Sequence, residues 1–148
     1  MTSKLVIGLD GQSSGQRALT YAQELAAKLG SCELLVTYVI EWSPFSFQTP
    51  EENEQRHKRR TQEIDTAMER VVTPAVAALT EAGISARGIV RHGNVADTLI
   101  DVAEEEGADQ IIVSRSSEDG LAKRLFGSST ANLVMHATVP VTVVNPGV

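Results

Sequence analysis

Residues 109–130 read DQIIVSRSSEDGLAKRLFGSST, and this stretch decides the fold. Its β-branched run at 111–113 is typical of a strand, and the run ends in small polar residues. A basic loop follows, and Gly127 and Ser128 then have the composition of a helix start. A strand, a loop and a helix in this order present backbone N–H groups and hydroxyls to an anion such as a phosphate chain.

Outward from this stretch, strand-like apolar runs alternate with helical patterns. Strands are predicted at residues 4–10, 32–40, 85–91, 109–113 and 139–144. Helices are predicted at residues 13–29, 51–82, 95–106 and 127–137. Pro74 is expected to kink or restart the second helix. Five strands separated by four helical segments predict an α/β three-layer sandwich around a parallel sheet, although periodicity does not fix the strand order.

Length and composition restrict the function classes. A chain of 148 residues predicts one domain, 1–148, that is large enough to bury a core. The net charge of −6 argues against broad nucleic-acid binding. No apolar run approaches the roughly 20 residues that a membrane span requires, so no membrane partner is expected. The first residues lack the regions of a signal peptide and the single Cys32 has no disulfide partner, so a cytoplasmic location is expected.

The basic loop and the helix start resemble those of the universal stress protein family, and the resemblance covers residues 5–145. Nucleotide-binding members carry Gly, two residues, Gly, nine residues, and then Gly-Ser or Gly-Thr. Gly127 keeps that spacing here, whereas Ser114 and Ser117 replace the two leading glycines. Glycine adopts positive φ freely and lets phosphate oxygens approach the backbone. The two serines therefore predict a weaker phosphate site, unless their hydroxyls themselves donate to the phosphate.

The resemblance implies a five-stranded parallel sheet of order 3-2-1-4-5, the adenine nucleotide alpha hydrolase-like fold. In such a sheet the ligand crevice lies at the carboxyl ends of strands 1 and 4, where the crossovers leave in opposite directions. The implied ligand is ATP or another adenine nucleotide, with or without Mg²⁺. The implied binding residues are Gly8, Leu9, Asp10, Val39, Val113, Ser114, Ser117, Gly127, Ser128, Ser129 and Thr130. Of these, residues 8–10 would hold the adenosine end and Val39 would pack on the adenine. Phosphates and ribose would be surrounded by Ser114, Ser117, Gly127, Ser128, Ser129 and Thr130.

Two parts of this proposed site also have ordinary structural explanations. Asp10 can close its strand in an Asx-type turn. Gly127 to Thr130 can serve as a simple N-cap of the following helix. The glycines around Asp10 do not match a dinucleotide fingerprint, and no P-loop occurs in the chain, so hydride and P-loop chemistry are not expected.

Catalytic groupings do not stand out in the sequence. His57 falls in a charged helical segment, His92 is expected in the loop at the carboxyl end of an edge strand, and His136 falls in the last turn of a helix. Neither a general base nor a metal site is predicted from them. Cys32 is expected to be a small packed hydrophobe. Slow ATP hydrolysis is the most that these residues predict.

Three functional hypotheses follow. The first is a cytoplasmic universal stress protein that binds an adenine nucleotide and signals its occupancy to partners in a stress response, without efficient catalysis. The second is a nucleotide-free dimeric interaction module, and the third is an enzyme of adenylyl or phosphoryl transfer. The resemblance implies a homodimer paired through the edge strand Val139–Val144. The aromatic loop Trp42–Phe47 is expected either to pack on the second helix or to act as a lid.

Overall fold

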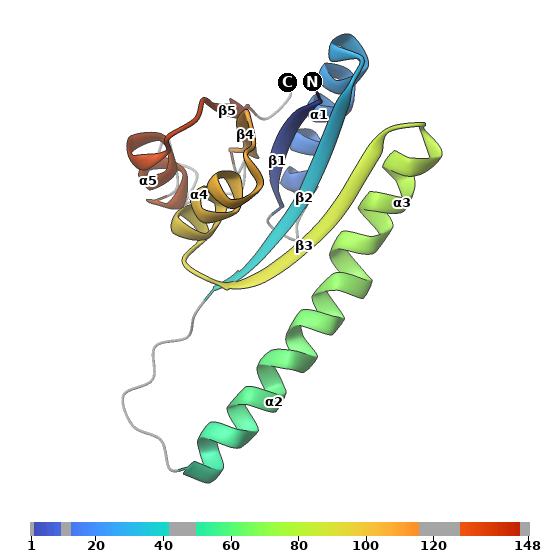
Figure 1. Cartoon of the computed structure of the whole chain (residues 1–148). Helices are drawn as coiled ribbons and strands as arrows, with labels where there is room; N and C mark the ends of the chain where they lie inside the picture. The colour runs from blue at the N-terminus through green and yellow to red at the C-terminus, as the bar shows by residue number, and fades with distance from the viewer. Residues whose placement is uncertain (1, 10–12, 42–49, 116–127, 146–148) are drawn as a thin grey trace.

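The structure is a computed structural model that describes residues 2–9, 13–41, 50–115 and 128–145. Strands and helices alternate along these residues, as the sequence predicts (Figure 1). The strands are β1 (Ser3–Leu9), β2 (Cys32–Glu41), β3 (Ser85–Gly93), β4 (Gln110–Ser114) and β5 (Val141–Val144). The helices are α1 (Ser13–Leu29), α2 (Pro50–Ala67), the π-helical turn η1 (Met68–Val72), α3 (Thr73–Glu81), α4 (Val95–Glu106) and α5 (Ser128–His136). No helix within these ranges is both long and apolar enough to cross a membrane.

The five strands form one parallel sheet in the order β3-β2-β1-β4-β5. This order confirms the predicted α/β fold and the strand order implied by the family resemblance. β1 is the central strand: its Val6 pairs with Leu35 of β2 on one side and with Ile111 of β4 on the other. The chain therefore builds one half of the sheet outward from β1 to β3 and then returns to β4 to build the other half.

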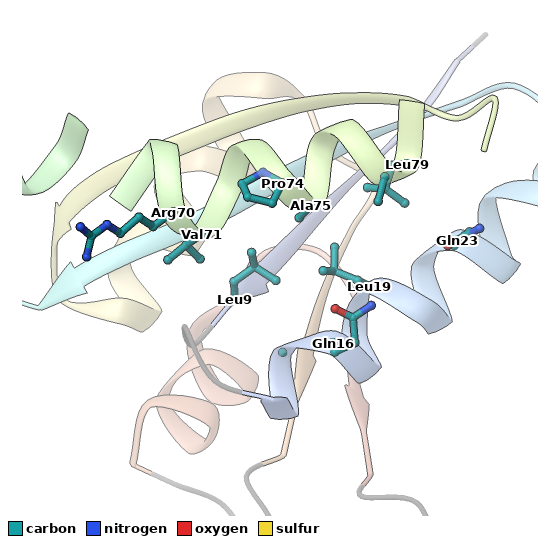
Figure 2. Close-up of a pocket in the computed structure, with 11 residues that line it drawn as sticks. Leu9, Gln16, Leu19, Gln23, Arg70, Val71, Pro74, Ala75 and Leu79 are labelled. Atoms are coloured by element: carbon teal, nitrogen blue, oxygen red, sulfur yellow. The ribbon is translucent and has the colours of Figure 1, made fainter. Parts of the chain in front are cut away.

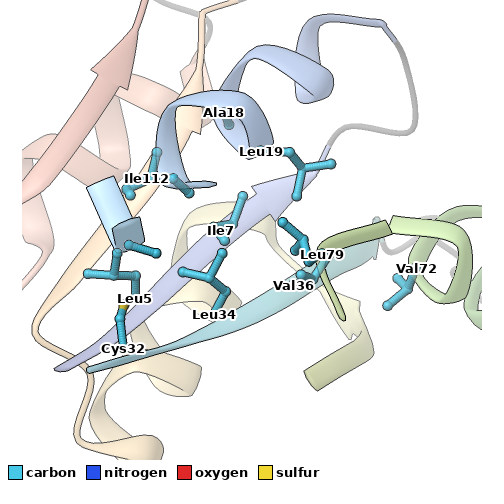
Figure 3. Close-up of a cluster of buried hydrophobic side chains, with 12 residues drawn as sticks. Leu5, Ile7, Ala18, Leu19, Cys32, Leu34, Val36, Val72, Leu79 and Ile112 are labelled. Atoms are coloured by element: carbon cyan, nitrogen blue, oxygen red, sulfur yellow. The ribbon is translucent and has the colours of Figure 1, made fainter. Parts of the chain in front are cut away.

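Each face of the sheet has its own helices and its own apolar cluster. Alternate side chains of a strand point to opposite faces. Leu5 and Ile7 of β1 lie in a cluster with α1, η1 and α3 (Figure 3). Val6 lies in a second cluster with residues of α4 and α5, such as Leu99 and Leu133. Strands that are apolar on both faces are what a sheet covered on both faces requires.

The second helical segment passes through Pro74 without breaking. Pro74 lies in the first turn of α3, and the turn before it is π-helical, with the backbone N–H of Thr73 donating to the carbonyl of Met68. Val72 of this turn is fully buried against β3. A Cβ at Gly88 would lie only 2.4 Å from Val72 Cγ1, so glycine at this position allows the π turn to approach the sheet.

Two strand ends differ from the sequence prediction by two residues, and the other ends differ by at most one. β3 extends to Gly93, which makes His92 a strand residue and not a loop residue. β5 begins later than predicted, at Val141, because Pro140 has no N–H to donate. The carbonyl of Pro140 still joins the ladder and accepts from the N–H of Ile111 at 2.9 Å.

Candidate functional site

The carboxyl ends of β1 and β4 lie side by side in the middle of the sheet. Gly8 pairs with Val113, so that Leu9 and Ser114 end their strands at the same level. From β1 the chain enters α1 on one face, whereas from β4 it continues to α5 on the other face. We call this place the switch point, because the crossovers change face here. Open parallel sheets bind ligands at such points. It is the location that the sequence analysis predicts for the ligand.

The structure places part of the predicted binding set at the switch point and divides it between the two faces of the sheet. On the α4 face lie Gly8, Val39 and Val113, and on the α1 face lie Leu9 and Ser114. Thr130 lies half-buried in the first turn of α5. The backbones of Ser128 and Ser129 begin that helix, but their side chains lie outside the described part of the chain, as do Asp10, Ser117 and Gly127.

The residues on the α4 face are closely packed. A Cβ at Gly8 would lie 2.9 Å from Leu99 Cδ1 and 3.0 Å from Val113 Cγ1. Val39 and Val113 belong to the same cluster and are only 7% and 8% exposed. Glycine at position 8 is therefore explained by helix packing, and the two valines offer a ligand only their outer edges.

Ser114, the first serine of the family spacing, has a hydrogen-bond partner within the protein. Its Oγ accepts from the backbone N–H of Ala18 in α1 at 3.0 Å. Ser114 is also the last residue of β4 and pairs with Val144, so its backbone is extended and needs no positive φ. The bond to Ala18 uses the hydroxyl as an acceptor and leaves its proton able to donate. This serine ties α1 to β4 and still offers a donor to a ligand.

The sequence analysis missed two arginines beside this serine. Arg17 directly precedes Ala18, and Arg115 directly follows Ser114 and donates its backbone N–H to the carbonyl of Val144 at 2.9 Å. Nη1 of Arg17 and Nε of Arg115 are buried and have no hydrogen-bond partner in the structure as described. Arg115 lies within residues 109–130, and its position next to Ser114 is a signal that could have identified it. Arg17 carries no such signal in the sequence.

A cavity of about 330 Å³ adjoins the switch point on the α1 face (Figure 2). It lies between α1 and α3, and Leu9, Leu19 and Val71 give it an apolar lining. Gln16 and Arg70 contribute polar groups. Because the predicted adenine contact at Val39 lies on the α4 face, this cavity is separate from that contact.

The described residues contain no catalytic grouping at the switch point. His92 contacts Glu63 of α2, with 2.9 Å between Nε2 and Oε2, and β2 and β1 separate it from β4. Cys32 is buried at the opposite end of the sheet, and burial, followed by the charges of Asp109 and Glu33, raises the pKa of its thiol. Cys32 is therefore a packed thiol, as predicted, and no cluster of metal-binding side chains occurs within the described ranges.

Comparison with known sequences connects this geometry to a family. The model of the universal stress protein family matches residues 1–145. Universal stress protein MJ0531 of Methanocaldococcus jannaschii is 28% identical over 142 residues, which cover 95% of this chain and 81% of that protein. Universal stress protein G of Shigella flexneri is 38% identical over 55 residues, but the match spans only 37% of this chain and 38% of that protein.

Solved structures show the same fold. The structure of MJ0577 of Methanocaldococcus jannaschii has a TM-score of 0.74 at 25% identity, covering 99% of this chain and 98% of that chain. A universal stress protein in complex with cAMP has a TM-score of 0.69 at 22% identity, with the same coverages. A family protein from Arabidopsis thaliana with AMP bound has a TM-score of 0.61 at 16% identity, covering 98% and 92%. By sequence and by fold, the chain belongs to the universal stress protein family.

Proposed function

We propose that this universal stress protein binds an adenine nucleotide such as ATP at the switch point and signals its occupancy to protein partners, without efficient catalysis. The observation that carries the proposal is the pairing of β1 with β4, whose crossovers leave by opposite faces. The hydroxyl proton of Ser114 supplies a donor beside that pairing, and the start of α5, which follows β4 in the chain, offers backbone N–H donors. The cAMP and AMP complexes of proteins with this fold support the choice of ligand.

Isothermal titration calorimetry with ATP, ADP and AMP tests the proposal, together with mass spectrometry of any nucleotide that copurifies. Val39→Ala removes methyl groups at the predicted adenine contact and should weaken all three nucleotides by about threefold, because only the outer edge of the side chain is exposed. Val102→Ala is the matched control, since it removes the same atoms from the same apolar cluster but lies in α4. Equal affinities for the two variants would show that the adenine does not contact Val39. No binding by the parent protein would end the proposal.

One observation favours the nucleotide-free alternative. Ser114 already serves α1 by accepting from the N–H of Ala18, so its position has a structural use without any ligand. In that case the protein acts only as an interaction module, and partner binding does not respond to added nucleotide. Capture of partner proteins from a cell lysate with and without ATP would separate the two functions once the calorimetry is done.

We also propose that the protein forms a homodimer through β5. β5 is an edge strand that pairs only with β4 among the described strands. The carbonyls of Pro140 and Val144 accept from β4, so the backbone groups of Val141 and Val143 point away from the sheet. An edge with unpaired backbone groups is a template for a second copy.

Substitution of Val143 tests this dimer. Val143→Pro removes an outward N–H without removing a bond to β4, and it should give a folded monomer in light scattering. Val143→Ala is the control, because it loses similar packing but keeps the N–H. If Val143→Pro remains a dimer, the copies do not meet through this edge.

A further inference from the structure

α5 exposes two adjacent hydrophobic side chains. Leu133 of this helix is buried in the apolar cluster on the α4 face of the sheet. The next two residues, Val134 and Met135, are 53% and 76% exposed. Single exposed hydrophobic residues are common on protein surfaces, so the position of this pair decides whether it marks a contact with another chain.

The neighbouring helix α4 shows which flank of α5 carries Val134. The two helices lie side by side and run in the same direction, because each returns the chain to the start of a strand in a parallel sheet (Figure 1). In α4, Ala103 is buried, and its successor Glu104 lies on the flank toward α5, where its Oε1 accepts from Thr138 Oγ1 at 3.3 Å. Val134 follows the buried Leu133 in the same way, so it lies on the flank of α5 that faces away from α4.

This flank faces the open edge of the sheet. α4 packs mainly over β1, β2 and β3, whereas Leu133 of α5 shares its cluster with Val113 of β4 and Val141 of β5. The strand order is β3-β2-β1-β4-β5, so a step from α4 to α5 is a step toward the edge strand β5. Val134 therefore faces the side on which a second copy would pair with β5.

Pairing through β5 would bring two α5 helices together. A two-fold axis that continues the sheet from an edge strand to its own copy makes these strands antiparallel and stands perpendicular to the sheet. Such an axis keeps both α5 helices on the same face. Because α5 lies over β4 and β5, and neighbouring strands are about 4.8 Å apart, the two helix axes would be roughly 10 Å apart. Helices pack against each other at about this distance.

The edge strand by itself offers little area. β5 has four residues. Stable protein interfaces bury about 1,200–2,000 Å² in total, and a pairing of four residues from each copy is too short to supply that area. A stable dimer through β5 therefore requires further contacts, and α5 is the helix beside the two-fold axis.

We propose that Val134 and Met135 form a second layer of the homodimer, in which α5 of one copy packs against α5 of the other beside the paired β5 strands. The inference rests on the proposed dimer and names a further surface that the dimer uses. Val134 faces the two-fold axis, and Met135, one residue further round the helix, covers the outer rim of the contact. Symmetry places each side chain in the interface twice.

Sedimentation equilibrium of the full chain tests the second layer, because it measures the dissociation constant of the dimer. Val134→Glu should raise this constant by about a hundredfold, since a charge is buried at two symmetric places and each costs about tenfold. Met135→Glu should raise it by about tenfold, because this side chain lies at the rim. Leu29→Glu is the matched control: it replaces a hydrophobic side chain that is 47% exposed, but at the end of α1 on the opposite face. Circular dichroism checks that each variant is folded.

The results separate the helix contact from the strand pairing. If Val143→Pro gives a monomer while all three glutamate variants keep the dissociation constant of the parent, the second layer is refuted and the strand pairing stands. If Val143→Pro remains a dimer while the variants of Val134 and Met135 dissociate and the Leu29 control does not, the strand pairing fails and the contact through α5 stands. Equal weakening by all three glutamate variants would be an effect of charge alone and would refute the second layer. A parent that is monomeric at every concentration refutes both.

Discussion

The two ends of the sheet treat their polar groups differently. At the amino end, the backbone N–H of Lys4 donates to Asp109 Oδ2 at 2.9 Å, and the N–H of Asp109 donates back to the carbonyl of Lys4 at 2.8 Å. The N–H of Ser3 donates to the carbonyl of Ser31 at 3.1 Å. At the carboxyl end, the guanidinium groups of Arg17 and Arg115 each keep a buried nitrogen without a partner in the described structure.

The difference indicates which end of the sheet satisfies its polar groups without a ligand. Donors and acceptors that satisfy each other contribute to stability, whereas unpaired charged donors cost free energy until a ligand meets them. Substitutions at the amino end should therefore change the free energy of unfolding without changing ligand affinity. Substitutions of donors at the carboxyl end should do the reverse.

The largest exception to this division is expected at Gly8, where a substitution at the carboxyl end should change stability. It lies near the carboxyl end of β1, but Gly8→Ala would bring a Cβ to 2.9 Å from Leu99 and 3.0 Å from Val113. Overpacking of this kind costs about 1–3 kcal/mol of the free energy of unfolding. Urea denaturation followed by circular dichroism measures the loss, and an unchanged midpoint would show that the two side chains move aside freely.

Asp109 provides the test at the amino end. Asp109→Ala removes the acceptor of the Lys4 N–H and should lower the free energy of unfolding by about 1 kcal/mol, while ATP affinity stays that of the parent. Asp65→Ala, on the exposed surface of α2, controls for the loss of one negative charge. A drop in ATP affinity for Asp109→Ala alone would mean that the two ends are coupled.

Ser114 sharpens the comparison, because it contributes to both stability and the candidate site. Ser114→Gly loses the bond to Ala18 and should lower the free energy of unfolding by about 0.5–1.5 kcal/mol. It should not tighten ATP binding, since the extended backbone at this position gains nothing from glycine. Calorimetry of Ser114→Gly beside Ser114→Ala measures this, and tighter binding by the glycine variant would show that the side chain crowds the ligand.

The smallest effect is expected at the exposed ion pair of Arg91 and Glu105, 2.6 Å apart. The hydrogen bond from Arg91, followed by its charge, lowers the pKa of Glu105. A carboxyl whose pKa is lower in the folded state stabilises above its unfolded pKa, and that contribution is lost as pH falls through the folded pKa. Because water and salt screen an exposed pair, Glu105→Gln should leave the melting temperature at neutral pH unchanged. A clear drop there would contradict this view of the pair.

The parts of the fold that could be predicted from sequence depend on local signals. α4 begins after Asn94, whose side chain accepts from the N–H of Asp97 at 3.0 Å, and ends at Gly107 with φ 65°. Cap residues of this kind are recognisable within a few positions. The π turn before Pro74 could not be predicted in this way, because it depends on the space that Gly88 leaves on another element.

The place of Ser114 in the sheet could be predicted from the sequence, but its interactions could not. Apolar strand patterns and the family spacing together placed Ser114 beside the end of β1. The bond from Ala18 to Ser114 joins residues that are far apart in the chain, and no periodicity shows it. Likewise, Arg17 lies in an ordinary helical segment. Its place near Ser114 depends on the packing of α1 on β4, which the sequence pattern does not specify.

The central position of β1 has a consequence for how the chain folds. β1 is synthesised well before its partner β4: Lys4 of β1 and Asp109, which directly precedes β4, share a hydrogen bond although they are 105 residues apart. Until β4 emerges from the ribosome, β1, β2 and β3 can assemble with α1 and α3, while one edge of β1 stays uncovered. Long-range parallel pairing is slow, and an open apolar edge is prone to aggregation. The newly made chain is therefore most vulnerable to aggregation just before β4 emerges.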